Sequence, residues 1–469
     1  MLRVLLLTFK DSSNLGDAVI EACSRNLLKA VLGQLGVAEY VLESQDLSYN
    51  NDADIASFDL IVFGGGGLVK YKYQDFHEQI PYFVAIAQTH GIPVVFSGVG
   101  VEGFDPADPR CLELQKALKS PCVVQITTRD DIESLGRYMT DEAIPIAKVL
   151  DPAVLSGRVF NKKRAKTAQR IGLNVVRGGL FQANGKPWEE DDEVEFWKDV
   201  ALILEGKGYP YAFFTNGLFS DEVFIQRLEN ELSLSNDQAI LDVNDQDMLL
   251  DTLGSFKGVI AFRLHASVIS YSLGIPSVGL AWNEKVSFFY ENIHYPERAL
   301  PFADWKAETV VEALEAALNE GVDDRGGPSP SLADTFEWLY RGVDRGLQVL
   351  AQEGRLDWSR PQGGKADYAQ ALDSLTGAEK RLTPEGRYER AVMKIDDMRI
   401  HYYGKQQALQ ERDRTIRRLD KAKQKAADKA RRLAKKNRRI KAKNKALDEK
   451  IRELKEEGPT LGRIRRGLD

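Results

Sequence analysis

Cysteine, histidine and long apolar runs are scarce in this 469-residue sequence. Its cysteines, Cys23, Cys111 and Cys122, are odd in number and lack the paired spacing of metal ligands, which indicates a reducing compartment and a packing role as small hydrophobic side chains. Two D-x-D patterns, at 52–54 and 245–247, are explained by helix capping. The sequence therefore predicts no disulfide framework and no metal site.

The sequence also lacks a membrane-spanning segment and a signal peptide. No stretch approaches the roughly 18 uninterrupted apolar residues of a spanning helix. The first residues, MLRVLLLTFKDS, contain a short apolar run without the cleavage site of a signal peptide, so we interpret residues 4–9 as a buried strand. We expect a cytoplasmic protein, peripheral at most to the inner face of the plasma membrane.

Charge is distributed unevenly along the chain. Residues 405–469 contain 24 Lys/Arg and 10 Asp/Glu, a net charge of +14, whereas residues 1–404 have a net charge of −20. Such a change in composition marks a boundary between parts with different partners.

The region before this boundary alternates short apolar runs with amphipathic stretches, a pattern typical of parallel sheets covered by helices on both faces. It predicts an α/β protein of two doubly wound, Rossmann-like domains, over 1–155 and 156–325, followed by a helical segment and linker over 326–400. The predicted strands are 4–9, 60–65, 93–98, 123–130, 171–176, 210–216, 258–263 and 276–282. Two such domains direct the carboxyl ends of their strands, and hence their ligand site, toward a shared cleft.

Residues 402–457 follow a heptad repeat, and 458–469 form a basic tail. The a and d positions are Ile416, Leu419, Lys423, Ala426, Ala430, Leu433, Asn437, Ile440, Asn444, Leu447, Ile451 and Leu454. Two asparagines at position a favour a parallel two-stranded coiled coil, so we expect a homodimer. A single solvated helix stays an alternative, because Lys423 and two alanines weaken the middle of the seam.

The basic segment has several candidate partners. Weak contact with an anionic membrane surface suits its charge. Nucleic acid is disfavoured, because no aromatic residue lies between Tyr403 and the C-terminus to stack on bases.

Two glycine-containing segments are candidate substrate-binding loops of the first domain. Asn14, Gly16 and Asp17 open the first predicted helix, whose N-terminal N–H groups suit an anion or polar group; helix capping by Asp17 is the alternative. Four glycines over 64–67 follow a buried strand. Such a run costs conformational entropy, so we expect Gly65 and Gly66 to contact a ligand or the facing domain.

A third glycine segment matches a dinucleotide-binding pattern without its context. Residues 98–103, GVGVEG, read as G-x-G-x-x-G. No helix begins there, and the segment is not the first strand-to-helix turn of the domain. We therefore do not expect a dinucleotide cofactor.

Cationic residues and one histidine follow three predicted strands. Arg129 ends one, Arg263 and His265 end another, and Lys285 follows a third. One residue apart on a strand end, Arg263 and His265 would project to the same face. Arginine suits phosphate or carboxylate, and histidine suits proton transfer near neutral pH. Each cation could instead be an ordinary surface ion-pair partner, but their convergence favours a functional site around His265, Arg263 and Arg129.

At these segments the sequence resembles the polysaccharide pyruvyl transferase family. The matching pieces, in family order over about residues 1–300, are NLGDAVI, FGGGGL, SGVGVEGF, TTRDDIESL and FRLHASVISYSLGIPSVGLAWNEKV. The resemblance implies a glycosyltransferase-B-like fold, in which the helix LADTFEWLYRGVDRGLQVLAQ would return to the first domain. It also implies transfer of an enolpyruvyl unit from phosphoenolpyruvate to hydroxyls of a cell-surface polysaccharide or its lipid-linked precursor, without a cofactor.

On this resemblance, Arg129, Arg263 and Lys285 would bind the phosphate and carboxylate of the donor. His265 would act as general acid or base, protonating the donor methylene or relaying a proton from the attacking hydroxyl. Two other functions stay open: a nucleotide-sugar glycosyltransferase of the same architecture, and a non-catalytic scaffold that carries the coiled coil.

Overall fold

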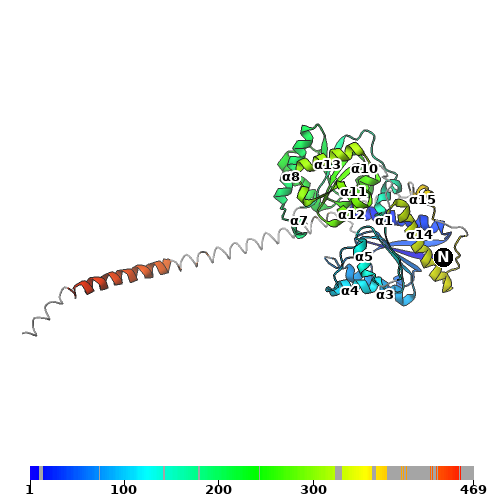
Figure 1. Ribbon diagram of the computed structural model, residues 1–469, viewed down its shortest axis with the longest axis horizontal. Helices are drawn as coiled ribbons and strands as arrows, with labels where there is room; N and C mark the ends of the chain where they lie inside the picture. The colour runs from blue at the N-terminus through cyan, green and yellow to red at the C-terminus, as the bar shows by residue number, and fades with distance from the viewer. Residues whose placement is uncertain are drawn as a thin grey trace, which may run out of the picture. The chain divides into compact units, whose positions relative to one another are not determined.

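A computed structural model of the chain (Figure 1) describes most of residues 1–377 and a helix near the C-terminus. The described residues are 1–9, 14–72, 74–140, 143–177, 180–241, 243–322, 330–361, 366–375, 377, 392, 395, 398, 423, 425, 429, 431–453 and 455. The chain divides into two compact units, Met1–Asp396 and Asp397–Asp469. The first unit contains two parallel-sheet α/β domains of six strands each, as expected.

The first domain is built on a sheet in the order β2-β1-β3-β4-β5-β6, all parallel. Its strands are β1 Leu2–Thr8, β2 Tyr40–Asp46, β3 Leu60–Gly64, β4 Val94–Val99, β5 Val123–Thr128 and β6 Ile146–Lys148. Alternate side chains of β1 enter different hydrophobic cores, Leu6 on one face and Leu7 on the other. Both faces are covered, which explains why the central strands read as continuous apolar runs.

Helices cover the two faces of this sheet (Figure 1). They are α1 Leu15–Gln34, α2 Asp52–Ile55, α3 Phe76–His90, α4 Pro109–Leu118 and α5 Ile132–Tyr138. Helix α14, Leu332–Gln352, comes from after the second domain and packs on α1, β4 and β5. It is fixed there by the Gln125 Nε2 amide, which donates to Trp338 O over 2.7 Å. The short helix α15, Tyr368–Leu375, packs beside it on α1.

The second domain has the strand order β12-β11-β10-β7-β8-β9, again all parallel. Its strands are β7 Arg170–Asn174, β8 Tyr211–Phe214, β9 Ala239–Ile240, β10 Phe256–Ala261, β11 Ser277–Ala281 and β12 Ala299–Pro301. Its helices are α7 Leu180–Ala183, α8 Glu190–Gly206, α9 Phe219–Leu232, α10 Gln246–Gly254, α11 Leu264–Ser272, α12 Glu284–Asn292 and α13 Ala307–Glu320. From β7 the chain adds strands to one side of the sheet and then, from β10, to the other side, so β7 and β10 mark a switch point. Open α/β sheets bind ligands at such a switch point.

A short segment joins the two domains through their cores. The 3-10 helix η1, Pro152–Leu155, and helix α6, Ser156–Val159, follow β6. Helix η1 packs against α1 of the first domain and α11 of the second. Ala153 and Leu155 are buried in one hydrophobic core that contains residues of both domains. The domains are therefore in direct contact along α1, η1 and α11.

The second unit is described mainly over residues 431–453, which are helical and exposed throughout. Five predicted heptad positions lie outside the described residues: Ile416, Leu419, Ala426, Ala430 and Leu454. None of the helices in the described part of the chain is long and apolar enough to cross a membrane.

Candidate functional site at the domain junction

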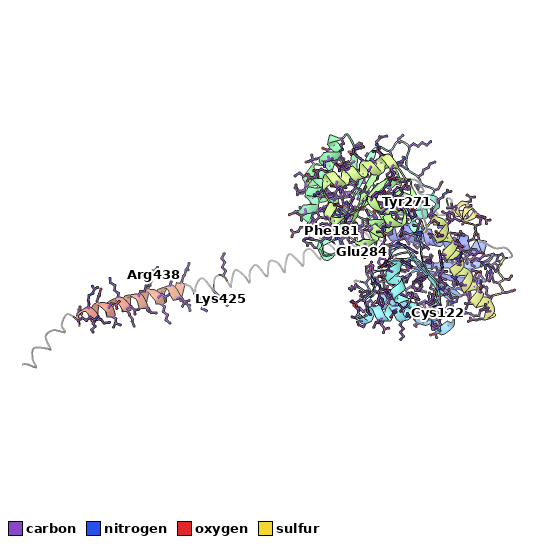
Figure 2. The ribbon with its side chains drawn as sticks, in the orientation of Figure 1. Cys122, Phe181, Tyr271, Glu284, Lys425 and Arg438 are labelled. Carbon is purple, nitrogen blue, oxygen red and sulfur yellow. The ribbon has the colours of Figure 1, made fainter. Side chains whose placement is uncertain are left out.

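A narrow pocket lies where the carboxyl ends of β5 and β6 face helices α11 and α12. It is lined by Arg129, Asp130, Leu150, Asp151, Leu264, Val268, Lys285, Phe289 and Asn292. Figure 2 marks Glu284, the residue before Lys285, near the junction of the two domains. The pocket has a volume of about 10 Å³, space for about one water molecule. Both domains contribute charged side chains to it.

A buried chain of three charged or polar side chains crosses the junction beside this pocket. Arg129 follows β5, and its Nη1 group pairs with Asp151 Oδ2. Asp151 follows β6 and caps η1, accepting a hydrogen bond from the Ala153 N–H over 2.8 Å. The same Oδ2 atom lies 3.7 Å from Nε2 of His265, on α11 of the second domain. Asp151 therefore connects the arginine of one domain with the histidine of the other.

The charges of Arg129 and Asp151 stabilise one another. Burial raises the pKa of Asp151, but Arg129 and then His265 outweigh burial, so the pKa of Asp151 is held well below its usual range. Burial lowers the pKa of Arg129, yet Asp151, Asp130 and Asp17 together raise it above its usual value. Asp151 is thus an ionised carboxylate beside the imidazole of His265.

The N-terminus of α1 forms the other wall around His265. A Cβ atom added at Gly16 would lie 2.4 Å from His265 Nδ1, so any side chain at position 16 would force the imidazole to move. Asn14 caps the helix, accepting from the Gly16 N–H over 3.2 Å, and its Nδ2 group donates to Asp17 Oδ2 over 2.8 Å. Asn14, Gly16 and Asp17 thus shape the helix end that supports the histidine.

Lys285, which also lines the pocket, crosses the junction. It is the second residue of α12, and its Nζ group pairs with Glu102 Oε1 in the loop after β4. Lys70 Nζ lies 3.4 Å from the same Glu102 oxygen. A Cβ atom at Gly67 would lie 2.8 Å from Lys285 Nζ, so the glycine loop allows the lysine to approach.

The other glycines of this loop serve the first domain itself. Gly65 and Gly66 adopt left-handed conformations, with φ of 63° and 74°, which glycine adopts without steric cost. A Cβ atom at Gly65 would lie 2.2 Å from Ile20. The contact that we expected with the facing domain is made by Gly67, whereas Gly65 packs on α1.

Arg263 is placed differently from our expectation. The strand ends at Ala261, and Arg263 is the N-cap residue of α11. Its Nε and Nη2 groups donate to the two oxygens of Asp221 over 2.9 and 2.7 Å. His265 instead contacts Gly16 and Asp151, so the prediction that both residues continue a strand and project to one face was wrong. The chain turns into a helix after Ala261, which separates the two side chains.

Several buried polar atoms of the site have no hydrogen-bond partner among the described residues. They are Arg129 Nε, Asp130 Oδ2 and His265 Nε2. Such atoms are costly to bury without a partner, and they are typical of a site that binds a polar ligand. No group of three or more potential ligands in the described part of the chain is placed to hold a metal ion.

Three residues of the site were not found by sequence reasoning: Asp151, Glu102 and Lys70. Asp151 follows β6, a three-residue edge strand that carries almost no apolar pattern. An aspartate just before a proline, in LDPAV, is a common helix-start signal and could have indicated it. Glu102 lies inside the G-x-G-x-x-G segment, which we did not expect to bind a dinucleotide. No role was predicted for Glu102 from the sequence.

Comparison with known proteins assigns the chain to a family. A family model described as polysaccharide pyruvyl transferase matches residues 14–284, more than half of the sequence; the match includes Arg129, Asp151 and His265 and ends one residue before Lys285. Among curated proteins, no match is found.

Solved structures with a similar arrangement include two epimerases. UDP-GlcNAc 2-epimerase from Methanocaldococcus jannaschii, in complex with UDP-GlcNAc and UDP, is 12% identical, with 75% of this chain and 99% of that chain covered and a TM-score of 0.45. The enzyme from Neisseria meningitidis, bound to UDP-GlcNAc, is 10% identical, with 75% and 100% covered and a TM-score of 0.44.

Proposed function

The chain belongs to the polysaccharide pyruvyl transferase family, and on that premise we propose that it transfers a pyruvyl group from phosphoenolpyruvate to two hydroxyls of a glycan. The acceptor would be a cell-surface polysaccharide or its lipid-linked precursor. The product is a pyruvate ketal, and the leaving group is inorganic phosphate.

The reaction requires one proton donor and two anion-binding groups. Protonation of the donor methylene makes C2 electrophilic, and the first acceptor hydroxyl attacks it. The bond from C2 to the phosphate oxygen then breaks, and the second hydroxyl forms the second C–O bond. Of the two hydroxyl protons, one replaces the proton given to the methylene and the other leaves with phosphate.

The residues of the domain junction suit these tasks. His265 would be the general acid, with the ionised Asp151 beside its imidazole to position it. Proton transfer by a positioned side chain accelerates reactions by about 10²–10⁴-fold. Arg129 and Lys285, which line the pocket, would bind the carboxylate and phosphate of the donor. Arg263 would support the second domain through Asp221.

The single observation that carries this proposal is the chain Arg129–Asp151–His265, assembled from both domains and buried. A pocket of about 10 Å³ is too small for phosphoenolpyruvate. Donor binding therefore requires the loops or the two domains to move apart, and closure would then bring the histidine to the donor with water excluded.

The experiment is thermal unfolding of the full chain with phosphoenolpyruvate, a UDP-sugar or a GDP-sugar. We expect stabilisation by phosphoenolpyruvate alone, because a ligand that binds the native state raises its stability. The shift should be lost in Arg129→Met and kept in Lys198→Met, a control on the exposed face of α8. Stabilisation only by a nucleotide sugar would replace the proposal with glycosyl transfer. No stabilisation by any of them would support a non-catalytic scaffold.

A further inference from the structure

A second cationic residue lies beside Lys285 and shares its acidic partner. Glu102 Oε1 faces the ammonium groups of both Lys285, from α12, and Lys70, which lies 3.4 Å away in the first domain. The three side chains are partly buried, with exposed fractions of 24%, 15% and 30% for Lys285, Lys70 and Glu102. One carboxylate oxygen thus holds two cations at the pocket end.

The backbone holds Lys70 and Glu102 in this arrangement. Val69 and Val101, the residues before them, form a parallel bridge. The Glu102 N–H donates to Val69 O over 2.9 Å, and the Val69 N–H donates to Gly100 O over 3.0 Å. The backbone positions of both residues are therefore set by the first domain.

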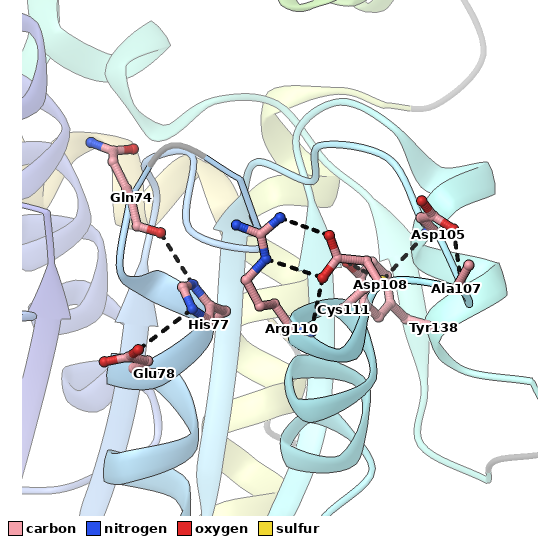
Figure 3. A network of polar contacts seen from close by, with 9 residues as sticks. All are labelled: Gln74, His77, Glu78, Asp105, Ala107, Asp108, Arg110, Cys111 and Tyr138. Carbon is pink, nitrogen blue, oxygen red and sulfur yellow. Dashed lines mark hydrogen bonds and ion pairs between the residues drawn. The ribbon is translucent and has the colours of Figure 1, made fainter.

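Contacts further along the loop fix it to α4 and α5 (Figure 3). The Asp105 N–H donates to Cys111 Sγ over 3.4 Å, and that thiol donates to the Tyr138 hydroxyl over 3.2 Å. Asp108 caps α4 and pairs with Arg110 through both carboxylate oxygens. A loop anchored in this way presents Glu102 at a defined place.

The electrostatics of the three groups are unbalanced toward positive charge. Burial lowers the pKa of Lys70, and of the two charged neighbours Glu102 opposes this while Lys285 adds to it. Burial raises the pKa of Glu102, but Lys285 and Lys70 outweigh burial and lower it. Two ammonium groups thus share one carboxylate, and a group with more negative charge and more oxygens would satisfy both better.

We propose that Lys70 and Lys285 form the phosphate-binding position of the donor site, and that Glu102 occupies it as an internal anion until the donor phosphate displaces it. This inference rests on the proposed function, which supplies a donor with a phosphate group. Lys285 lines the pocket with Arg129, so a phosphate between the two lysines leaves the donor carboxylate to Arg129. Release of Lys285 from Glu102 also removes an ion pair that ties the domains together.

The test compares ligand binding to Glu102→Gln and Lys70→Met in the full chain, with Glu78→Gln and Lys198→Met as exposed controls. Inorganic phosphate, pyruvate and phosphoenolpyruvate are titrated separately by calorimetry, and circular dichroism checks that each variant is folded. We expect Glu102→Gln to bind phosphate and phosphoenolpyruvate at least about threefold more tightly, because it keeps its size but loses its charge. Lys70→Met should bind both about tenfold more weakly, with pyruvate unaffected.

Unchanged phosphate binding by Lys70→Met, or weaker binding by Glu102→Gln, would overturn this inference. If wild-type protein binds phosphoenolpyruvate under those outcomes, the proposed function stands without it. The phosphate affinities of Glu102→Gln, wild type and Lys70→Met could follow the expected order while wild-type protein does not bind phosphoenolpyruvate. In that case the phosphate position stands and the proposed donor is wrong.

The helix over residues 431–453 carries an independent inference. Every residue in it is exposed, and it contains eleven Lys/Arg and three Asp/Glu; Figure 2 marks Arg438 on it. Apolar side chains nevertheless recur along one side of the helix. They are Leu433, Ile440, Leu447 and Ile451, with exposed fractions of 52%, 45%, 60% and 44%.

We infer that this helix binds an anionic lipid surface. Apolar residues with Lys/Arg beside them are typical of helices that lie in a membrane interface, where long cationic side chains reach the headgroups. A second copy suits the helix less well. In a parallel pair, Lys436 at position g would face Lys441 at position e of the partner copy, and like charges there oppose pairing.

Flotation of the full chain with vesicles tests this inference. We expect recovery with vesicles of phosphatidylcholine and phosphatidylglycerol, and none with phosphatidylcholine alone. Replacing Lys436, Lys441 and Lys443 by glutamine should weaken binding by about tenfold or more, and replacing Leu433, Ile440 and Leu447 by serine should also reduce it. Equal recovery on both vesicles would overturn the inference, as would a stable homodimer by light scattering that does not float.

Discussion

The backbone of Gly16 lies directly against the imidazole ring of His265, so close that a Cβ atom at Gly16 would be 2.4 Å from Nδ1. This contact joins the first helix of one domain to the helix of the R-L-H motif in the other. The glycine of the N-L-G-D segment is therefore needed for the position of the histidine, in addition to any contact with a ligand.

Gly16→Ala should reduce turnover strongly, because the ring of His265 must move to accept the new methyl group. We expect a loss of stability of about 1–3 kcal/mol, as for other overpacked sites. Gly33→Ala is the matched control, since Gly33 lies in the same helix and nothing is within 4 Å of its added Cβ. That variant should be more stable than wild type by about 0.5–1 kcal/mol, with unchanged donor binding. Urea unfolding and donor titration of both variants measure the difference.

Asp151→Asn should separate the positioning role of Asp151 from proton transfer. The change leaves the buried Arg129 without its closest charge partner, which costs about 3 kcal/mol or more when a buried pair is broken. It also removes the negative charge beside His265. We therefore expect kcat to fall, because His265 loses the carboxylate that positions it, with a smaller change in KM. A variant that loses stability but keeps the wild-type kcat would show that Asp151 has only a structural role.

Arg263→Met should destabilise the second domain more than it affects the donor. Asp221 is completely buried, and its loss of a bidentate partner should cost about 3–5 kcal/mol. The double variant Arg263→Met with Asp221→Asn should recover most of this loss, because no unpaired charge remains. Unfolding in urea and stabilisation by phosphoenolpyruvate would be measured in parallel. If the double variant is stable but no longer binds the donor, Arg263 contacts the donor after all.

Glu193→Gln should change the pH dependence of stability. Glu193 is buried on α8, accepts a hydrogen bond from Trp197 Nε1, and burial raises its pKa well above the usual range. The folded protein then keeps a proton that the unfolded chain releases above about pH 4.3. Wild-type stability should fall as the pH rises toward the pKa of folded Glu193, whereas the variant lacks this loss.

Unfolding in urea at pH 5 and pH 8 measures this effect. We subtract the free energy of unfolding of wild type from that of Glu193→Gln at each pH. This difference should be larger at pH 8 than at pH 5 by about 1 kcal/mol or more. Glu195→Gln, on the exposed side of the same helix, should show no such trend. A difference that is constant with pH would mean that Glu193 is ionised in the folded protein.

The central strands of both sheets could be predicted from the sequence, whereas the outer ones could not. Predicted and observed strands agree within a few residues for the eight inner positions, from β1 to β11. The four that were missed are β2, β6, β9 and β12, which are the edges of the two sheets. Edge strands are partly exposed, as β2 and β6 are along their whole lengths, so they lack a continuous apolar run.

The positions of site residues were easier to predict than their partners. Arg129, His265 and Lys285 were expected at the junction because they follow apolar strands, and the structure places them there. Their acidic partners Asp151 and Glu102 lie in a weakly patterned edge and in a loop. The pairing of Arg263 with Asp221 depends on a helix from elsewhere in the domain, which no local pattern encodes.

Helix η1 has a consequence for how the protein folds. By sequence Pro152–Leu155 belongs to the first domain, but its side chains complete a core shared with α11 of the second. Neither half can bury the apolar surface of this shared core alone, so the halves should unfold together in one cooperative transition. A chain that has lost either half would have no residual activity, and activity would report directly on the fraction of completely folded protein.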